Sequence, residues 1–238
     1  MHGMTTRMLM TNGRNDALYR LMTWLSPTYP VGAYSYSHGL EWAVQAGDVT
    51  NADSLLEWLS DVVRYGTGRT DAILFTHAWR AVTAGDAAAL HTAAEFGVAA
   101  ATSKERHVET TAQGKAFVSA TRAAWPCDAL GMLDESCDGE VAYPVAVACA
   151  SAGHFVPIES ALTAYLHAWA ANLVSAGLRL VPLGQSDGQR IIVRLEAVVS
   201  ATMGAALDAS LDDIGSAAVL ADIAAMQHET QHTRLFRT

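Results

Sequence analysis

Apolar residues return every three or four positions along most of this chain, which is the spacing of one face of an α-helix. Alternating apolar and polar residues, typical of half-buried strands, are almost absent, and no hairpin turn lies between β-branched runs. The pattern therefore predicts an all-α protein. The clearest helical stripes are Leu18, Leu21, Met22 and Leu25; Leu55, Leu56, Leu59, Val62 and Val63; and Leu162, Tyr165, Leu166, Trp169 and Leu173.

Capping residues, glycines and prolines divide this pattern into a bundle of roughly eight to ten helices with short loops. Asn15 or Asp16 can begin the first helix, and Ser186 with Gln189 forms a capping box at the start of a later one. Thr50 is a further candidate N-cap. The expected helices cover residues 15–26, 33–46, 50–65, 70–84, from 86 onward, 103–124, 157–177 and 186–199, and a last one runs from Asp212 or Ser216 to Gln227.

The stretch with the weakest helical pattern is residues 126–140, which we expect to be a loop. Residues 141–152 are apolar and are expected to be a buried helix or turn that Pro144 interrupts. No internal repeat and no long linker divides the chain, so we expect a single domain. The predicted division is a flexible N-terminal tail (1–14), an all-helical domain (15–225) and a C-terminal tail (226–238).

The composition argues against several classes of protein. Hydrophobic residues make up 51% of the 238 residues and charged residues 16%, which argues against a disordered chain. The net charge is −9 without a Lys/Arg cluster, so we expect no nucleic-acid partner. No run of roughly 18 apolar residues and no secretory signal is present, so no membrane partner is expected. Cys127, Cys137 and Cys149 lack metal-site spacing and predict free thiols in the cytoplasm.

The residues from Ser26 to Glu41 combine two prolines, two glycines, three tyrosines and a histidine. The prolines end the preceding helix near Ser26. An extended backbone would place Tyr34, Tyr36 and His38 on one side, whereas a helix would group Tyr34, His38 and Glu41. The segment can be a connection whose tyrosines cover the core, or a stiff functional element. His38 and Glu41 could share a metal, but a hydrogen bond between them is the favoured interpretation.

The segment from His228 to His232 matches the HExxH pattern of zinc peptidases. On a helix, these two histidines would lie one turn apart and could bind a divalent metal, with Glu229 as the base. Such an enzyme needs a third protein ligand, which the few residues after His232 do not supply. A helical metal-binding protein or enzyme that uses His228 and His232 is the alternative function kept here.

Other chemistry has little support in the sequence. No Walker loop is present, so we do not expect this chain to bind GTP in that way. Glu105, Arg106 and Glu109 have the spacing of a solvated helix face. The turn from Pro182 to Gln189 reads as a helix start, whose free N–H groups could also bind a partner's carboxylate. We therefore expect an interaction protein without catalytic residues or a cofactor.

Three separated segments, in order and across most of the chain, resemble the UreF family of urease accessory proteins. The first is Pro30-Val31-Gly32-Ala33-Tyr34-Ser35-Tyr36-Ser37-His38-Gly39-Leu40-Glu41, which we call the signature segment. The others are the turn from Pro182 to Gln189 and the C-terminal segment from His228 to Arg237. The family usually has Phe at the position of Tyr34 and often Gln at that of His38.

The resemblance implies a non-catalytic protein that helps to assemble the nickel centre of urease. It would form a homodimer and bridge UreD (also called UreH) and the GTPase UreG, so that GTP-dependent nickel delivery reaches apo-urease. The resemblance also implies that the C-terminal tail becomes ordered when it docks onto UreD. In that tail Leu235 and Phe236 would be apolar anchors, and Arg234 and Arg237 would bind carboxylates.

Carried onto this chain residue by residue, the resemblance assigns partner binding to all three segments. The residues are Tyr34, Ser35, Tyr36, His38, Glu41, Gln185, Asp187, Gln189, His228, Glu229, Arg234, Leu235, Phe236 and Arg237. Their contribution would be surface and geometry rather than bond-making chemistry.

Overall fold

The structure is a computed structural model that describes residues 2–137 and 139–237, with side chains from residue 13 onward. These residues form eleven α-helices, two 3-10 helices and no strand, which confirms the predicted all-α class. The α-helices are α1 (His2–Trp24), α2 (Leu40–Ala46), α3 (Ala52–Tyr65), α4 (Thr67–Ala84), α5 (Ala87–Ala99), α6 (Lys104–Ala124), α7 (Asp128–Ser136), α8 (Tyr143–Gly153), α9 (Ile158–Leu180), α10 (Gln185–Asp208) and α11 (Val219–His228). The 3-10 helices are η1 (Ala33–Ser35) and η2 (Leu211–Asp213).

Helix α8 is the centre of the bundle and packs against α4, α5, α6, α7 and α9. Every side chain from Pro144 to Ala152 is buried. Pro144 lies in the first turn, where a missing N–H costs nothing, so it begins the helix and does not interrupt it. The small residues of α8 let its neighbours approach closely. At Gly114 of α6, an added Cβ would lie only 2.0 Å from the carbonyl oxygen of Val141.

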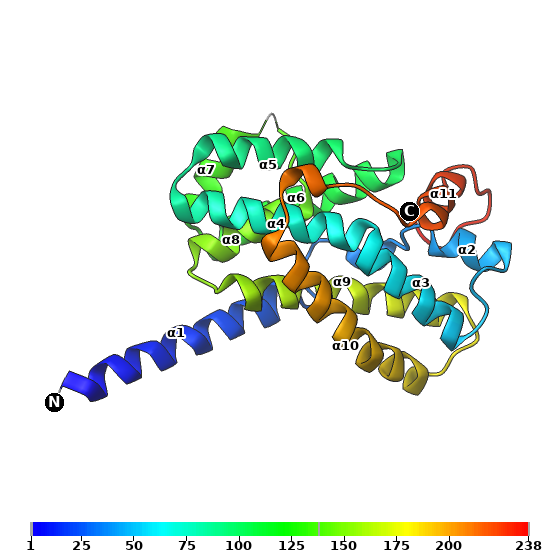
Figure 1. Cartoon of the computed structure of the whole chain (residues 1–238), viewed down its shortest axis with the longest axis horizontal. Coiled ribbons are helices and arrows are strands. Elements are labelled where there is room, and N and C mark those ends of the chain that lie inside the picture. Colours follow the sequence, from blue (N-terminus) through cyan, green and yellow to red (C-terminus); the bar gives the residue numbers. More distant parts are fainter. Residues whose placement is uncertain (1, 138, 238) are drawn as a thin grey trace.

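A second group of helices consists of α3, α9 and α10, and α4 contacts all three of them. The apolar stripes predicted in the segments of α3 and α9 are buried. Helix α1 runs outward from the body (Figure 1). The predicted apolar stripe of α1 is only partly buried: Leu21 is buried, whereas Leu18 and Met22 are 57% and 67% exposed. The first helix therefore covers the core only near its C-terminal end.

Several predicted helix starts differ from the structure: α4 begins at Thr67 and not at 70, and α11 begins at Val219 and not at 212 or 216. Two further differences have a clear local cause. Helix α1 begins at His2 and not at Asn15 or Asp16, because no proline breaks the helical ladder upstream of them. The N-cap of α3 is Asn51 and not Thr50, since the Asn51 carboxamide accepts N–H groups of the first turn. The division into tail, domain and docking segment stays a prediction.

Two predicted segments are also organised differently. The expected loop at 126–140 contains α7, whose apolar side packs against α5 and α8. The expected helix at 33–46 is split, because Gly39 adopts a φ of 76° that interrupts helical geometry. Cys127, Cys137 and Cys149 form no disulfide. None of the helices described is both long enough and apolar enough to cross a bilayer.

Replacing Gly114 by Ala tests the close approach of α6 to the chain entering α8. The new Cβ would collide with backbone, which cannot rotate away, so we expect Gly114→Ala to lower the free energy of unfolding by about 3 kcal/mol. Gly131→Ala in α7 is the matched control, because nothing lies within 4 Å of an added Cβ there. Its helix should gain up to about 1 kcal/mol. Equal unfolding curves for the two variants in urea would contradict the packing described.

Candidate partner-binding site

The signature segment lies between α1 and α2, includes the first two residues of α2, and contacts α11 at Gly39. Gly32, His38 and Gly39 have φ angles of 72°, 57° and 76°. Glycine adopts such angles freely, whereas His38 is under backbone strain. An added Cβ at Gly39 would lie 2.5 Å from the backbone nitrogen of Ala225 in α11. The glycine at position 39 is therefore required by both its backbone angle and its neighbour.

Side chains of helix α9 bond to the backbone of the signature segment. Asn172 donates a hydrogen bond of 2.9 Å to the carbonyl oxygen of Ala33, and Arg179 donates one of 3.0 Å to that of Tyr34. The Tyr34 side chain is 66% exposed and is thus presented to solvent on a fixed backbone. The other predicted partner-binding residues here are half-buried (Ser35) or buried (Tyr36, His38, Glu41).

His38 bonds to α6, and not to the Glu41 partner that the sequence predicts. Its Nε2 lies 2.8 Å from Oε1 of Glu109, which also accepts a 2.9 Å hydrogen bond from Gln113. The Arg106 guanidinium bonds to the second oxygen of the same carboxylate. Arg106 and Glu109 are 6% and 2% exposed. The predicted solvated face is therefore wrong for these two residues, because tertiary packing turns this polar stripe inward.

The charge state of this cluster follows from its contacts. Burial by itself raises the pKa of Glu109, but the Arg106 guanidinium and His38 outweigh burial and lower this pKa to about 2. Burial, assisted by the Arg106 charge, lowers the pKa of His38 below its usual value. Glu109 is thus a carboxylate paired with Arg106, and His38 is neutral, with its Nε2 at 2.8 Å from Oε1 of Glu109 and at 3.1 Å from Nη1 of Arg106.

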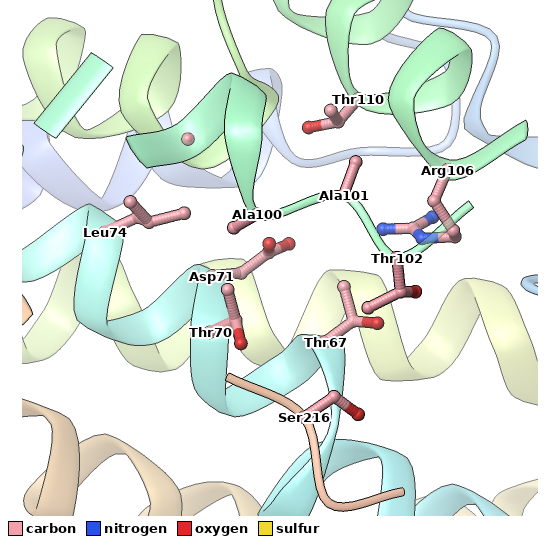
Figure 2. A pocket seen from close by; sticks show the side chains of 11 residues that line it. Thr67, Thr70, Asp71, Leu74, Ala100, Ala101, Thr102, Arg106, Thr110 and Ser216 are labelled. Atoms are coloured by element: carbon pink, nitrogen blue, oxygen red, sulfur yellow. The ribbon is translucent and has the colours of Figure 1, made fainter. Parts of the chain in front are cut away.

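Asp71 of α4 and Arg106 face a small cavity of about 30 Å³, and Figure 2 shows both side chains directed into it. Thr110 and Ser216 contribute further polar wall. A cavity of this size suits a water molecule and not an organic ligand. Burial raises the pKa of Asp71 to about 6, although the Tyr165 hydroxyl donates a 2.7 Å hydrogen bond to its carboxyl group. Asp71 is therefore a buried acid that titrates in a mildly acidic range.

His228 ends α11 and is completely buried between two carboxylates. Its Nδ1 lies 2.7 Å from Oε2 of Glu105, and its Nε2 lies 3.2 Å from Oε2 of Glu41. Because the helix ends at His228, the exposed His232 does not lie on the following turn, and the helical spacing assumed for a metal pair is lost. In the part of the chain that the structure describes, no three His, Cys, Asp or Glu side chains form a group suited to a metal ion.

The C-terminal segment folds back onto the signature segment, so the chain ends beside α2 and α11 (Figure 1). The Glu41 carboxylate accepts the backbone N–H groups of Leu235 at 2.6 Å and Phe236 at 2.9 Å. The Arg237 N–H donates to the carbonyl oxygen of Ser35 at 2.8 Å. The segment is therefore packed on its own domain, whereas the sequence predicts that it becomes ordered on a partner.

The two expected apolar anchors have different environments. Phe236 is 4% exposed, and the Arg179 guanidinium lies 4.3 Å from the centroid of its ring. Leu235 is 64% exposed. Arg234, expected to bind a partner's carboxylate, donates a 2.7 Å hydrogen bond to Glu105 of its own chain. Of these two apolar anchors, Leu235 can contact another protein without movement of the segment and Phe236 cannot, while Arg234 and Arg237 are exposed.

The turn before α10 is stabilised by Asp187, whose carboxylate accepts the N–H of Gly184 at 2.9 Å. This bond is the main cause that lowers the pKa of Asp187. The predicted capping box between Ser186 and Gln189 is wrong, because the helix begins at Gln185 and places Asp187 at its third position. Gln185 and Gln189 are exposed.

The structure brings two of the three predicted segments together through bonds within the predicted set, mainly those of Glu41 to His228, Leu235 and Phe236. Residues outside the predicted set hold both segments on the domain. Those residues lie on α6 and α9: Glu105, Arg106, Glu109, Asn172 and Arg179. On α6 a signal existed, since polar residues at 106, 109, 110 and 113 share one helical face. Asn172 and Arg179 of α9 are isolated polar residues at the end of an apolar stripe, and the sequence around them does not indicate which residues they contact.

Helix α11 turns its small side chains, Ala224 and Ala225, toward the body and its larger ones toward solvent. Scattered exposed apolar residues are ordinary, but several on one short helix form a candidate contact surface. We define the α11 face as four residues of α11 together with Leu235 of the C-terminal segment. They are 46–68% exposed: Val219, Leu220, Ile223, Met226 and Leu235.

Comparisons with known proteins agree with one another. A family model described as UreF matches residues 49–196. The chain is 55% identical over 225 residues to the urease accessory protein UreF of Rhodopseudomonas palustris (strain BisB5), covering 94% of this chain and 93% of the relative. It is 51% identical over 222 residues to the UreF of Bradyrhizobium diazoefficiens, covering 93% of this chain and 92% of the relative. The matches to these two relatives extend over nearly the whole chain.

The raised pKa of Asp71 has a consequence for stability. A folded-state value of about 6, against 3.8 in the unfolded chain, means that folding favours the protonated form, and this stabilisation is lost as pH rises through about 6. Asp71→Asn cannot titrate. From pH 4 to pH 7 the stability of this variant relative to the unsubstituted protein should rise by roughly 3 kcal/mol. Urea unfolding at several pH values measures this, and the exposed control Asp53→Asn should show no such trend.

Glu41 holds the C-terminal segment, so its charge can be tested separately from its shape. Glu41→Gln keeps the volume but weakens the bonds to His228 and to the Leu235 and Phe236 amides. Loss of charge-assisted bonds should lower the hydrogen-exchange protection of these two amides roughly ten- to a hundredfold. Glu57→Gln on the exposed side of α3 is the control. Unchanged protection in Glu41→Gln would refute the role assigned to Glu41.

Proposed function

The chain belongs to the UreF family of urease accessory proteins, and we propose that it is a non-catalytic scaffold in urease maturation. In this proposal it bridges UreD (UreH) and the GTPase UreG, so that GTP-dependent nickel delivery reaches apo-urease. The observation that carries the proposal is the α11 face, an exposed apolar surface fixed to the signature segment. The side chains of this protein position the partners and form the contact surface, and the partners supply the nucleotide and metal chemistry.

We assign the contact with UreD to the α11 face. Apolar side chains exposed on one helix gain free energy when a partner removes them from water. The buried residues of the signature segment then act indirectly: Gly39 lets α11 approach, while Glu41 bonds to His228 at its end. Leu235 extends the surface beyond the helix, and Glu41 holds its backbone. Phe236 stabilises the segment from within the domain and does not itself meet the partner.

The remaining predicted contact residues are exposed or half-buried at other places. Tyr34 is fixed by α9, and Gln185, Asp187 and Gln189 begin α10. We assign these residues to further contacts in the complex with UreG. For the homodimer we propose the groove between α1 and α9, a cavity of about 630 Å³ in which the exposed Leu18 and Met22 form one wall.

The alternative function, metal binding by His228 and His232, is not favoured. Both ring nitrogens of His228 lie within hydrogen-bond distance of carboxylates from Glu41 and Glu105, which leaves neither free for a metal. A ligand pair would require the end of α11 to unfold and these bonds to break.

A double substitution on the α11 face tests the proposed UreD contact. Leu220 and Ile223 are 68% and 46% exposed, so Leu220→Ser with Ile223→Ser should leave the melting temperature nearly unchanged. Loss of two apolar contacts should weaken UreD binding more than about tenfold. Isothermal titration or co-purification with UreD measures this loss.

The control for that experiment is Phe155→Ser, which removes a side chain that is 91% exposed in the turn after α8. It should bind UreD like the unsubstituted protein. If the double variant also binds normally, the α11 face is not the UreD surface. If the unsubstituted protein binds neither UreD nor UreG, the scaffold function itself fails.

A further inference from the structure

The ring of His228 faces a carboxylate with each of its two nitrogens. Nδ1 lies 2.7 Å from Oε2 of Glu105 in α6, and Nε2 lies 3.2 Å from Oε2 of Glu41 in α2. An ionised carboxylate can only accept a hydrogen bond, whereas a neutral imidazole carries hydrogen on one nitrogen alone. A neutral ring between two carboxylates would therefore turn one lone pair toward a negatively charged oxygen. Both contacts are hydrogen bonds only when both ring nitrogens carry hydrogen.

The charges that face His228 favour a positive charge at this position. Glu41 is the only charged residue of α2, and Glu105 comes from the first turn of α6. The Arg234 guanidinium of the C-terminal segment donates a 2.7 Å hydrogen bond to the other oxygen of Glu105. The neighbouring Glu229 accepts a backbone N–H at the start of α6. Two carboxylates and one guanidinium leave one negative charge around a ring that is completely buried, and an imidazolium compensates this charge.

We propose that His228 is an imidazolium in the folded protein and that its second hydrogen holds the C-terminal segment in place. Oε2 of Glu41 faces Nε2 of His228 and also accepts the N–H of Phe236 at 2.9 Å. Oε1 of the same carboxylate accepts the N–H of Leu235 at 2.6 Å. One carboxylate thus joins the end of α11 to the C-terminal segment. His228 is a positioning residue, because it fixes the carboxylate that binds the segment.

Loss of this hydrogen affects the two contacts of the ring unequally. The contact with Glu105 is the shorter one, so the hydrogen of a neutral ring stays on Nδ1 and the proton leaves from Nε2 to solvent. The lone pair of Nε2 then faces the Glu41 carboxylate, which is 8% exposed and can regain water only by moving. That movement breaks the bonds of Glu41 to the Leu235 and Phe236 amides.

A rise in pH therefore releases the C-terminal segment and, with it, Leu235 of the α11 face. The effect on partner binding rests on the function proposed above, since it requires that the α11 face contacts UreD. The protonation of His228 and the release of the segment are properties of this chain alone.

NMR of the histidine ring nitrogens in the full-length protein tests the protonation directly. Labelling with nitrogen-15 and a long-range proton–nitrogen correlation distinguish a ring with two N–H groups from a neutral ring. An exposed histidine is mostly neutral at about pH 7.5, and the exposed His232 is the control within the same chain. His228, assigned by comparison with the His228→Gln variant, should carry hydrogen on both nitrogens at this pH. A His228 ring with one unprotonated nitrogen overturns the proposal.

Glu105→Gln tests why the ring is charged. The Gln amide can donate to Nδ1, so a neutral ring with its hydrogen on Nε2 bonds to both neighbours and Glu41 keeps its partner as pH rises. In the unsubstituted protein, the hydrogen-exchange protection factors of the Leu235 and Phe236 amides should fall roughly tenfold from about pH 7 to about pH 9. These factors are corrected for the intrinsic pH dependence of exchange. In Glu105→Gln they should stay constant.

Glu135→Gln is the matched control, because it removes the same charge from an exposed position on α7, which packs against α5 and α8. This variant should reproduce the pH dependence of the unsubstituted protein. Protection that does not change with pH in the unsubstituted protein, or that still changes in Glu105→Gln, overturns the proposal. None of these measurements requires UreD, so failure of the UreD contact would leave their outcome unaffected.

Discussion

The Glu41 carboxylate is the interaction on which the proposed binding surface depends. It is 8% exposed, and a carboxylate removed from water must be hydrogen-bonded to remain charged. Its partners are the His228 ring and the backbone of Leu235 and Phe236, all distant in sequence. One side chain thereby joins the signature segment, the end of α11 and the C-terminal segment, and fixes the α11 face relative to the domain.

The polar clusters of this protein explain why its signature segment is mostly buried. His38 and Glu41 each bond to a polar side chain from another helix, Glu109 of α6 and His228 of α11. These bonds contribute orientation more than net stability, because desolvation offsets much of the electrostatic attraction. A segment held in this way can present Tyr34 and support α11 without itself forming the contact surface.

Much of the fold follows from the sequence, whereas the pairing within the site does not. The periodic stripes of α3 and α9 predict buried helices correctly, whereas Pro144 was expected to interrupt its segment and instead lies in the first turn of α8. The stripe of α6 is equally periodic but polar, and a polar stripe is ordinarily solvated. Only its neighbours, His38 and Asp71, reveal that this stripe lies inside. The capping box before α10 was predicted at Ser186 and Gln189, two positions after its place at Gly184 and Asp187, since several polar residues there can serve as caps.

By itself, the sequence determined the helical class, the apolar stripes and the three segments that carry the family resemblance. These properties are local: they depend on spacing within one helix or on consecutive residues. Only the tertiary structure decided that His228 lies between Glu41 and Glu105, that Phe236 is buried while Leu235 is exposed, and that α11 ends before His232. Such pairings join residues far apart in the chain, and many partners are compatible with the same local pattern, so packing of the whole domain selects among them.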